Sequence, residues 1–230
     1  MALLVVILQA ITLLATVIGS RSGGCDGGMK KVILSLALGT FGLGMAEFGI
    51  MGVLTELAHN VGISIPAAGH MISYYALGVV VGAPIIALFS SRYSLKHILL
   101  FLVALCVIGN AMFTLSSSYL MLAIGRLVSG FPHGAFFGVG AIVLSKIIKP
   151  GKVTAAVAGM GSGMTVANLL GIPLGTYLSQ EFSWRYTFLL IAVFNIAVMA
   201  SVYFGCQIFA TRRKESCANN FTFCAARPRG

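Results

Sequence analysis

Two side chains stand out chemically because they carry charge within stretches that are otherwise apolar. Glu47 lies in one such stretch and Arg126 in another. A charged residue inside the hydrocarbon of a membrane costs at least a few kcal/mol on insertion scales, so it usually faces a cavity or a partner. Counted from helix ends expected at Leu54 and Tyr119, each lies seven residues in, which is about 10 Å at 1.5 Å per residue. The two opposite charges are therefore expected at matching depth.

Other polar side chains in apolar stretches have two interpretations each. His133 follows Arg126 by two helical turns. Because its pKa lies near neutrality it suits a proton relay, although a neutral, hydrogen-bonded packing role fits equally. Asn110, Asn168 and Asn195 could bind substrate hydroxyls or amides in a cavity, but hydrogen bonding between helices is the commoner role of such side chains.

Enzyme chemistry has little support in the sequence. It contains no HExxH or GxSxG motif, and no cluster of acids or histidines sufficient for metal or nucleophilic catalysis. The five cysteines are odd in number and show no CxxC spacing, so they indicate neither a disulfide framework nor a zinc site. We therefore predict no catalytic residues, no metal and no cofactor.

The composition excludes a soluble protein. Hydrophobic residues make up 58% of the 230 residues and charged residues only 9%, against about a quarter in ordinary globular chains. A membrane-spanning helix needs about 20 mostly apolar residues, so we expect an all-α integral membrane protein. The predicted helices are 32–54, 70–90, 98–117, 119–144, 153–178 and 184–204.

The basic residues predict the orientation of these six helices. Twelve of the 15 fall on one side, and only Arg185 falls on the other. Since cytoplasmic loops carry the excess of Lys and Arg, residues 29–31 and the C-terminal tail are expected in the cytoplasm and loops 55–69, 116–118 and 179–183 outside. The net charge of +10 is thereby explained without a nucleic-acid partner.

The two ends differ from the middle, residues 29–204. Residues 1–28 form an apolar leader and a glycine-rich linker. The sequence from Met29 onward then resembles the start of a new chain. A signal peptide without the usual positive n-region, a signal anchor and translation from upstream of a natural start at Met29 all remain open. Residues 205–230 are basic, contain cysteine and lack apolar periodicity, which indicates a disordered or out-of-frame tail.

An internal repeat becomes visible when the sequence is shifted by 89 positions. The shift aligns Gly82 and Pro84 with Gly171 and Pro173, and it continues without a gap to align Lys96 with Arg185. These motifs end the second and fifth helices, which face opposite ways across the membrane. Two three-helix units of inverted topology are therefore expected, as in many secondary transporters; the alternative is that each proline simply kinks a helix.

Small residues recur at helical spacing in several of these helices. Gly130, Gly134 and Gly138 lie on one face of the fourth helix, and Gly171 with Gly175 repeats the spacing in the fifth. Small residues four apart let helices approach closely, so we predict a structural role for them.

Together these segments resemble the amino-terminal half of a major facilitator superfamily transporter of the drug and sugar efflux type. The resemblance rests on Phe41–Phe48, Tyr75–Gly78 with Gly82–Pro84, Arg126 with Gly130, and Trp184–Phe188. It implies twelve helices in two six-helix halves, with substrate and protons handled in a central cavity between them. This sequence resembles only the first half.

Two family motifs are incomplete here. In the cytoplasmic loop between the second and third helices, Arg92 and Lys96 are present, but Ser91 stands where an aspartate is expected and Ser94 where a glycine is expected. The usual interaction between charged residues of this loop and a helix therefore lacks its aspartate. The antiporter motif of the fifth helix is present only in part, as Gly171–Gly175.

The resemblance implies a function for the two buried charges, since both of their helices line the family's cavity. We predict that Arg126 keeps the Glu47 carboxylate ionised until Glu47 takes up a proton or a cationic substrate, or else that the two form a static ion pair. The expected function is proton-coupled efflux of sugars or small amphipathic compounds across the inner (plasma) membrane. The alternatives are a truncated fragment that does not transport and a half-transporter that needs a partner copy.

Overall fold

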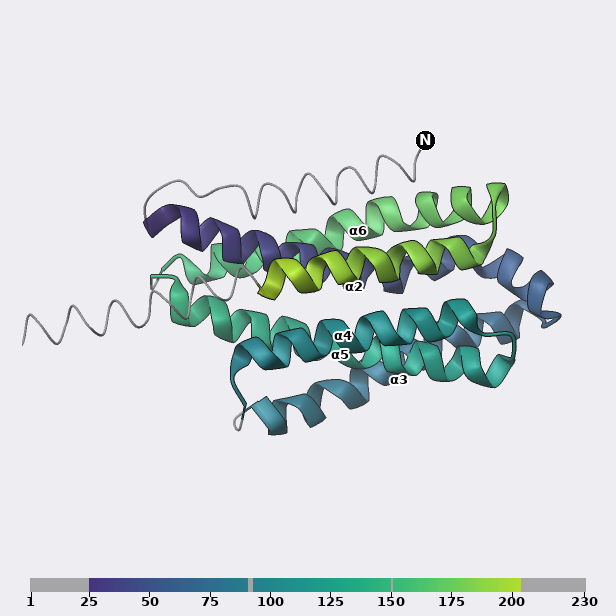
Figure 1. Cartoon of the computed structure of the whole chain (residues 1–230), viewed down its shortest axis with the longest axis horizontal. Helices are drawn as coiled ribbons and strands as arrows, with labels where there is room; N and C mark the ends of the chain where they lie inside the picture. The colour runs from purple at the N-terminus through teal and green to yellow at the C-terminus, as the bar shows by residue number, and fades with distance from the viewer. Residues whose placement is uncertain (1–24, 91–92, 150, 204–230) are drawn as a thin grey trace, which may run out of the picture.

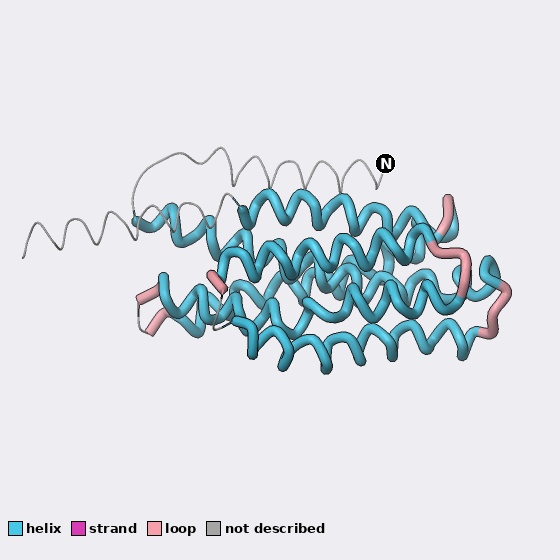
Figure 2. The backbone as a smooth tube through the Cα atoms, turned by 60° about the horizontal axis from the view of Figure 1, so that its bottom comes forward, coloured by secondary structure: helices cyan, strands magenta, loops and turns pink. Residues whose placement is uncertain are grey.

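The computed structural model describes residues 25–90, 93–149 and 151–203, and almost all of them are helical. The labelled helices are α2 (Cys25–Val61), α3 (Ile65–Ser90), α4 (Leu95–Leu115), α5 (Tyr119–Ile147) and α6 (Val153–Glu181). A further helix, called the last helix below, occupies Trp184–Tyr203. In the described part of the chain six helices are long and apolar enough to cross a membrane, so the predicted all-α, six-span fold is confirmed. Figure 2 shows that the connections lie at the two ends of the bundle.

The connection between α2 and α3 is much shorter than predicted. The expected loop 55–69 is wrong, because only residues 62–64 join the two helices. Gly62 ends α2 with a φ of 71°, a left-handed conformation that favours glycine. The Ser64 hydroxyl then accepts a hydrogen bond from the Ala67 amide at 3.3 Å, which caps α3. Helix α2 therefore continues through polar residues such as Glu56 and Asn60 to Val61, and α3 begins at Ile65, five residues before its predicted start.

The amino-terminal side also differs from the prediction. Helix α2 begins at Cys25, so the last four residues of the predicted linker within 1–28 are helical. Among the described residues only Gly62 and Gly151 have positive φ, and a glycine inside a helix costs only about 1 kcal/mol relative to alanine. The glycines at 27 and 28 therefore do not stop the helix. Residues 1–24, the predicted tail 205–230 and Arg92 lie outside the described residues.

The helices pair in the way that the predicted repeat requires. Helix α2, the first of its three-helix unit, packs mainly against α6, the second of the other unit. Helix α5 likewise packs against α3, and it also packs against α4. Figure 1 shows α2, α6 and the last helix on one side of the bundle and α3, α4 and α5 on the other. The first helices of the two units, α2 and α5, run in opposite directions.

Glycines bring the paired helices into backbone contact. A Cβ atom on Gly82 of α3 would overlap the carbonyl oxygen of Phe131 in α5. In the other helix pair, a Cβ atom on Gly175 of α6 would lie 2.7 Å from the carbonyl oxygen of Gly49 in α2, and one on Gly171 would lie 3.6 Å from the Gly49 amide nitrogen. The prolines of the repeated motif, Pro84 and Pro173, lie inside α3 and α6.

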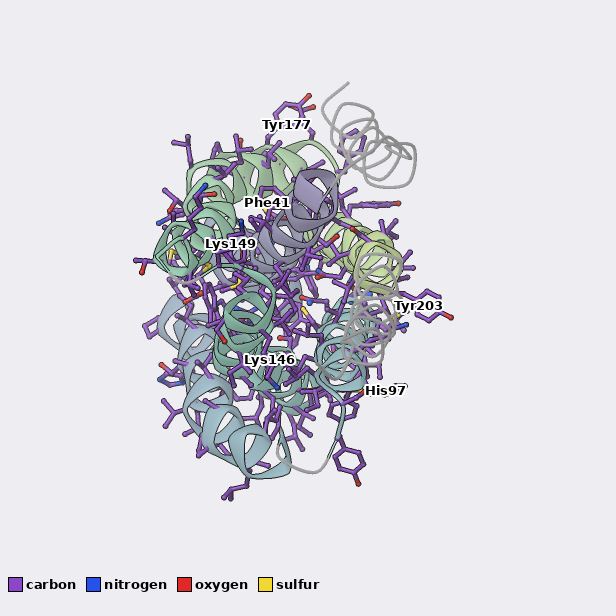
Figure 3. The ribbon with its side chains drawn as sticks, turned by 90° about the vertical axis from the view of Figure 1, so that its left-hand side faces the viewer. Phe41, His97, Lys146, Lys149, Tyr177 and Tyr203 are labelled. Carbon is purple, nitrogen blue, oxygen red and sulfur yellow. The ribbon has the colours of Figure 1, made fainter. Side chains whose placement is uncertain are left out.

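Basic residues collect at one end of the bundle. Figure 3 looks onto this end and labels Lys146 and Lys149 together with His97 and Tyr203. Lys96 also lies there, with its Nζ 4.1 Å from the centroid of the Tyr203 ring. Both ends of the described chain lie at this same end (Figure 1). Of the basic residues whose side chains the structure describes, Lys96, Lys146 and Lys149 thus lie at one end of the bundle.

A buried serine pair joins α2 to the last helix and allows a first prediction. The hydroxyls of Ser35 and Ser201 lie 3.0 Å apart. We expect Ser35→Ala to lower the free energy of unfolding by about 1 kcal/mol, the usual size of a hydrogen bond between membrane helices. Thermal unfolding in mild detergent measures the change. Ser162→Ala is the control, because the exposed Ser162 hydroxyl bonds only to Gly159 of its own helix; equal losses in both variants would contradict the prediction.

Candidate functional site: a polar cluster between three helices

Four polar side chains meet inside the bundle, where α2, α3 and α5 come together. They are Glu47 of α2, Tyr75 of α3, and Arg126 and His133 of α5, and we call them the polar cluster. Arg126 is fully buried, and Tyr75 and His133 are nearly so. The Glu47 side chain keeps 33% of its surface exposed. Because Arg126 and His133 are two turns apart, they lie on one face of α5, and Glu47 is the member of the cluster that opens to the surroundings.

The Glu47 carboxylate faces His133. Its Oε2 lies 3.6 Å from His133 Nε2, and this is the one pair of acidic and basic side chains within 4.0 Å among the residues that the structure describes. The predicted ion pair between Glu47 and Arg126 is therefore not formed in this structure. Sequence reasoning found both charged residues, and in this structure the carboxylate faces His133.

Backbone carbonyls and an aromatic ring hold the Arg126 guanidinium instead. Its Nη1 donates to the carbonyl of Ala46 at 2.7 Å and its Nε to that of Met71 at 3.4 Å. Its Cζ lies 4.5 Å from the centroid of the Tyr75 ring. Ala46 immediately precedes Glu47, but successive residues of a helix point about 100° apart. The guanidinium thus lies level with Glu47 without meeting its carboxylate, and its Nη2 has no hydrogen-bond partner.

The predicted end of the helix that carries Glu47 needs correction. Helix α2 continues to Val61, so Glu47 lies 14 residues, about 21 Å, from the end of its helix rather than seven. Arg126 lies seven residues from the first residue of α5, Tyr119, as predicted. The two side chains nevertheless lie at the same height along the bundle. Helix α2 extends beyond the start of α5 at the end opposite the basic residues (Figure 1).

Two aromatic residues contact the His133 ring, one at its Nδ1 edge and one on its face. Its Nδ1 lies 2.8 Å from the hydroxyl oxygen of Tyr75, and that hydroxyl also donates to the carbonyl of Leu43 at 3.3 Å. The ring stacks on Phe137 with 5.8 Å between centroids. His133 is thus a packed, hydrogen-bonded residue that also faces an acid.

The three asparagines lie in different surroundings. Asn110 is buried in α4 and donates to the carbonyl of Cys106, one turn back in the same helix, at 2.8 Å; its Oδ1 has no hydrogen-bond partner. Asn195 of the last helix donates to the Gly42 carbonyl of α2 at 3.4 Å. Asn168 is exposed on α6. The structure thus gives Asn195 the predicted bond between helices.

Tyr75 is the cluster residue whose role sequence reasoning missed. It was used only as part of a motif, because an aromatic residue in an apolar helix usually contributes to packing. The available signal was its hydroxyl, since a buried tyrosine hydroxyl generally needs a hydrogen-bond partner. That signal predicts a partner but cannot say which residue it is.

The polar cluster contains two groups that can each bind a proton, a carboxyl group and an imidazole. A carboxyl group and an imidazole face each other, and a guanidinium with a free donor lies level with them. In the described part of the chain no group of three or more His, Cys, Asp or Glu side chains could hold a metal ion.

Comparison with known proteins shows which family and which proteins this chain is similar to. Residues 36–221 match the family described as Major Facilitator Superfamily. The chain is 91% identical over 195 residues to AraJ of Escherichia coli strain K12, covering 85% of this chain and 50% of AraJ. It is 41% identical over 173 residues to the inner membrane transport protein YdhP of the same strain, covering 75% of this chain and 44% of YdhP.

A more distant relative comes from another genus. The chloramphenicol resistance protein of Streptomyces lividans is 28% identical over 165 residues, covering 72% of this chain and 42% of that protein. The chain thus spans about half the length of the relatives it matches.

Proposed function

Because the chain belongs to the Major Facilitator Superfamily, we propose that it serves secondary active transport, as a proton-coupled exporter of sugars or small amphipathic compounds. The six helices that are long and apolar enough to cross a membrane, counted in the described residues, supply the membrane-spanning part. The names of two relatives, an inner membrane transport protein and a chloramphenicol resistance protein, support export across the inner membrane. In this proposal residues 29–31 and the C-terminal tail lie in the cytoplasm.

The observation that carries the proposal is that one carboxylate has an imidazole and a guanidinium within its surroundings. Glu47 faces His133 at 3.6 Å, while Arg126, level with it, has an unpaired Nη2. A buried donor without a partner costs about 1 to 3 kcal/mol, and more for a charged group. A conformation in which the ionised carboxylate rotates to Nη2 removes that cost. We infer that Glu47 exchanges partners when it gains or loses a proton.

A second candidate function follows from the length of the chain and the exposure of Glu47. The chain spans about half of its relatives, and a third of the Glu47 side-chain surface is open. Because a carboxylate facing lipid is costly, that face needs a cover, either a second six-helix half or another copy of the chain. Native mass spectrometry in mild detergent distinguishes these cases: a dimer supports a paired half-transporter, and a monomer without transport supports a fragment that does not transport.

Replacement of Glu47 by glutamine tests the main proposal. The chain is reconstituted in vesicles that enclose a pH-sensitive dye, and proton movement is followed on adding a panel of sugars or the amphipathic cation ethidium. We expect Glu47→Gln to lower substrate-dependent proton flux at least tenfold, because an amide side chain cannot take up and release a proton as a carboxylate does.

The control for this experiment is Glu56→Gln. Glu56 lies in the same helix, and its carboxylate accepts a hydrogen bond from Asn60 one turn on, away from the polar cluster. We expect its flux to equal that of the unmodified chain. Undiminished proton flux in Glu47→Gln contradicts the proposal, and absence of flux in the unmodified chain favours the second candidate.

A further inference from the structure

The Tyr75 hydroxyl fixes where the proton of His133 must lie. The hydroxyl contacts two groups at once, His133 Nδ1 at 2.8 Å and the Leu43 carbonyl at 3.3 Å. A carbonyl oxygen can only accept, and a hydroxyl has a single proton to donate. When both hydrogen bonds are formed, that proton goes to Leu43, and the tyrosine oxygen must accept from His133. Nδ1 therefore carries a proton.

This tautomer determines what His133 presents to Glu47. A neutral imidazole has one N–H, so with the proton on Nδ1 the Nε2 atom is a bare acceptor. That atom faces Glu47 Oε2 at 3.6 Å. A lone pair facing an ionised carboxylate makes no hydrogen bond, which leaves the buried Nε2 of His133 without a partner. A single proton between the two atoms removes the conflict, whether it is bonded to the carboxyl oxygen or to Nε2.

We propose that Glu47 and His133 hold one exchangeable proton between them, and that Tyr75 is the positioning residue that turns the acceptor nitrogen of His133 toward Glu47. The inference rests on the proposed function and specifies its proton-binding site. In the transfer, the O–H bond of the Glu47 carboxyl breaks and an N–H bond forms at Nε2. The pair changes from a neutral acid and neutral base to a carboxylate and an imidazolium, with no change in net charge.

The surroundings of the pair suit such a transfer. Glu47 is partly exposed and can receive a proton from outside the bundle, whereas His133 is buried. The other titratable groups near it are Tyr75 on α3, Arg126 on its own helix and Cys106 of α4, which interacts with Tyr75 and Arg126. Helix α6 carries no charged residue before its last residue, Glu181, and the last helix carries only Arg185, at its start. Within the described residues, Glu47 is thus the acid positioned to exchange a proton with His133.

Nuclear magnetic resonance of the full chain labelled with 15N-histidine tests the proposal, because protonated and bare ring nitrogens have well-separated shifts. The His133 signals are identified by their loss in His133→Gln. In the unmodified chain we expect neutral His133 to carry its proton on Nδ1. We also expect the Glu47 carboxyl band in infrared spectra and the His133 Nε2 signal to change over the same pH interval. A neutral His133 protonated on Nε2, or titration of the two groups over separate intervals, overturns the proposal.

Tyr75→Phe supplies the sharper comparison. It removes the acceptor for the Nδ1 proton, so we expect neutral His133 to lose that tautomer and place its proton on Nε2, toward Glu47. Tyr74→Phe is the control, since the Tyr74 ring packs edge-on against Tyr119 at 6.4 Å, and it is expected to leave the tautomer unchanged. Retention of the Nδ1 proton in Tyr75→Phe refutes the positioning role. If that variant does not fold, the tautomer of the unmodified chain still decides.

These spectroscopic measurements do not require the chain to transport a substrate. A chain that shows the expected tautomer but carries no substrate-dependent proton flux contradicts the proposed function alone. A chain with flux but with the other tautomer contradicts the shared proton and the role given to Tyr75, and leaves the proposed function intact.

Discussion

Replacing Gly130 by alanine is expected to destabilise the bundle by about 3 kcal/mol, the upper part of the usual range for overpacking. A Cβ atom at this position would overlap the carbonyl oxygen of Tyr75 in α3 and lie 3.0 Å from its carbonyl carbon. Both are backbone atoms, so no side-chain rotation can relieve the overlap. Helices α3 and α5 would have to separate, and the side chains packed between them would lose contact. The same displacement would move the Tyr75 hydroxyl away from His133.

Gly138 provides the matched control in the same helix. It lies eight residues further along α5, and a Cβ atom there would meet nothing within 4 Å. Gly138→Ala is expected to stabilise the chain by about 0.5 to 1 kcal/mol, because glycine is a poor helix former. Thermal unfolding in mild detergent, followed by circular dichroism, measures both variants. Similar effects at the two positions would show that helical propensity, rather than close approach, governs Gly130.

The number and type of helices could be predicted because a membrane leaves few choices. Within hydrocarbon every backbone polar group must be satisfied internally, so a chain of long apolar segments becomes a set of helices. The helix ends were harder to predict. Beyond the hydrocarbon a helix can continue through polar residues, as α2 does to Val61, until a residue such as Gly62 changes the backbone direction.

The residues of the site were easier to predict than their partners. Glu47, Arg126 and His133 stand out because polar groups in apolar helices are costly. Which of them meet depends on directions around the helices, and one residue of difference turns a side chain by about 100°. That is why Arg126 meets the carbonyl of Ala46 and not the side chain of Glu47. Tyr75 was missed because its ring resembles any other apolar residue in a hydropathy pattern.

Replacing Arg126 by methionine is expected to abolish transport while leaving the fold intact. Methionine has a similar length without the charge, so the carboxylate of Glu47 loses the cationic partner that the proposed exchange needs. We expect substrate-dependent proton flux to fall at least about 100-fold, the smaller end of what a positioned proton-transfer group contributes. The flux assay is the one used for Glu47→Gln.

Stability is expected to change in the opposite direction. Holding a guanidinium in a buried site costs several kcal/mol, and methionine avoids that cost while filling much of the same space. The carbonyls of Ala46 and Met71, which Arg126 contacts, keep their acceptor roles within their own helices. Arg126→Met should therefore unfold at the same temperature as the unmodified chain or higher.

Arg126→Ala separates loss of charge from loss of volume. It removes the same charge but leaves a cavity beside the rings of Tyr75 and Phe113, and the expected loss is about 3 to 5 kcal/mol, as for other large buried side chains cut to alanine. If Arg126→Met is instead as unstable as Arg126→Ala, the guanidinium is a structural tie between helices, which is the static role. If it is stable but without flux, the buried charge is retained for transport, because the fold does not need it.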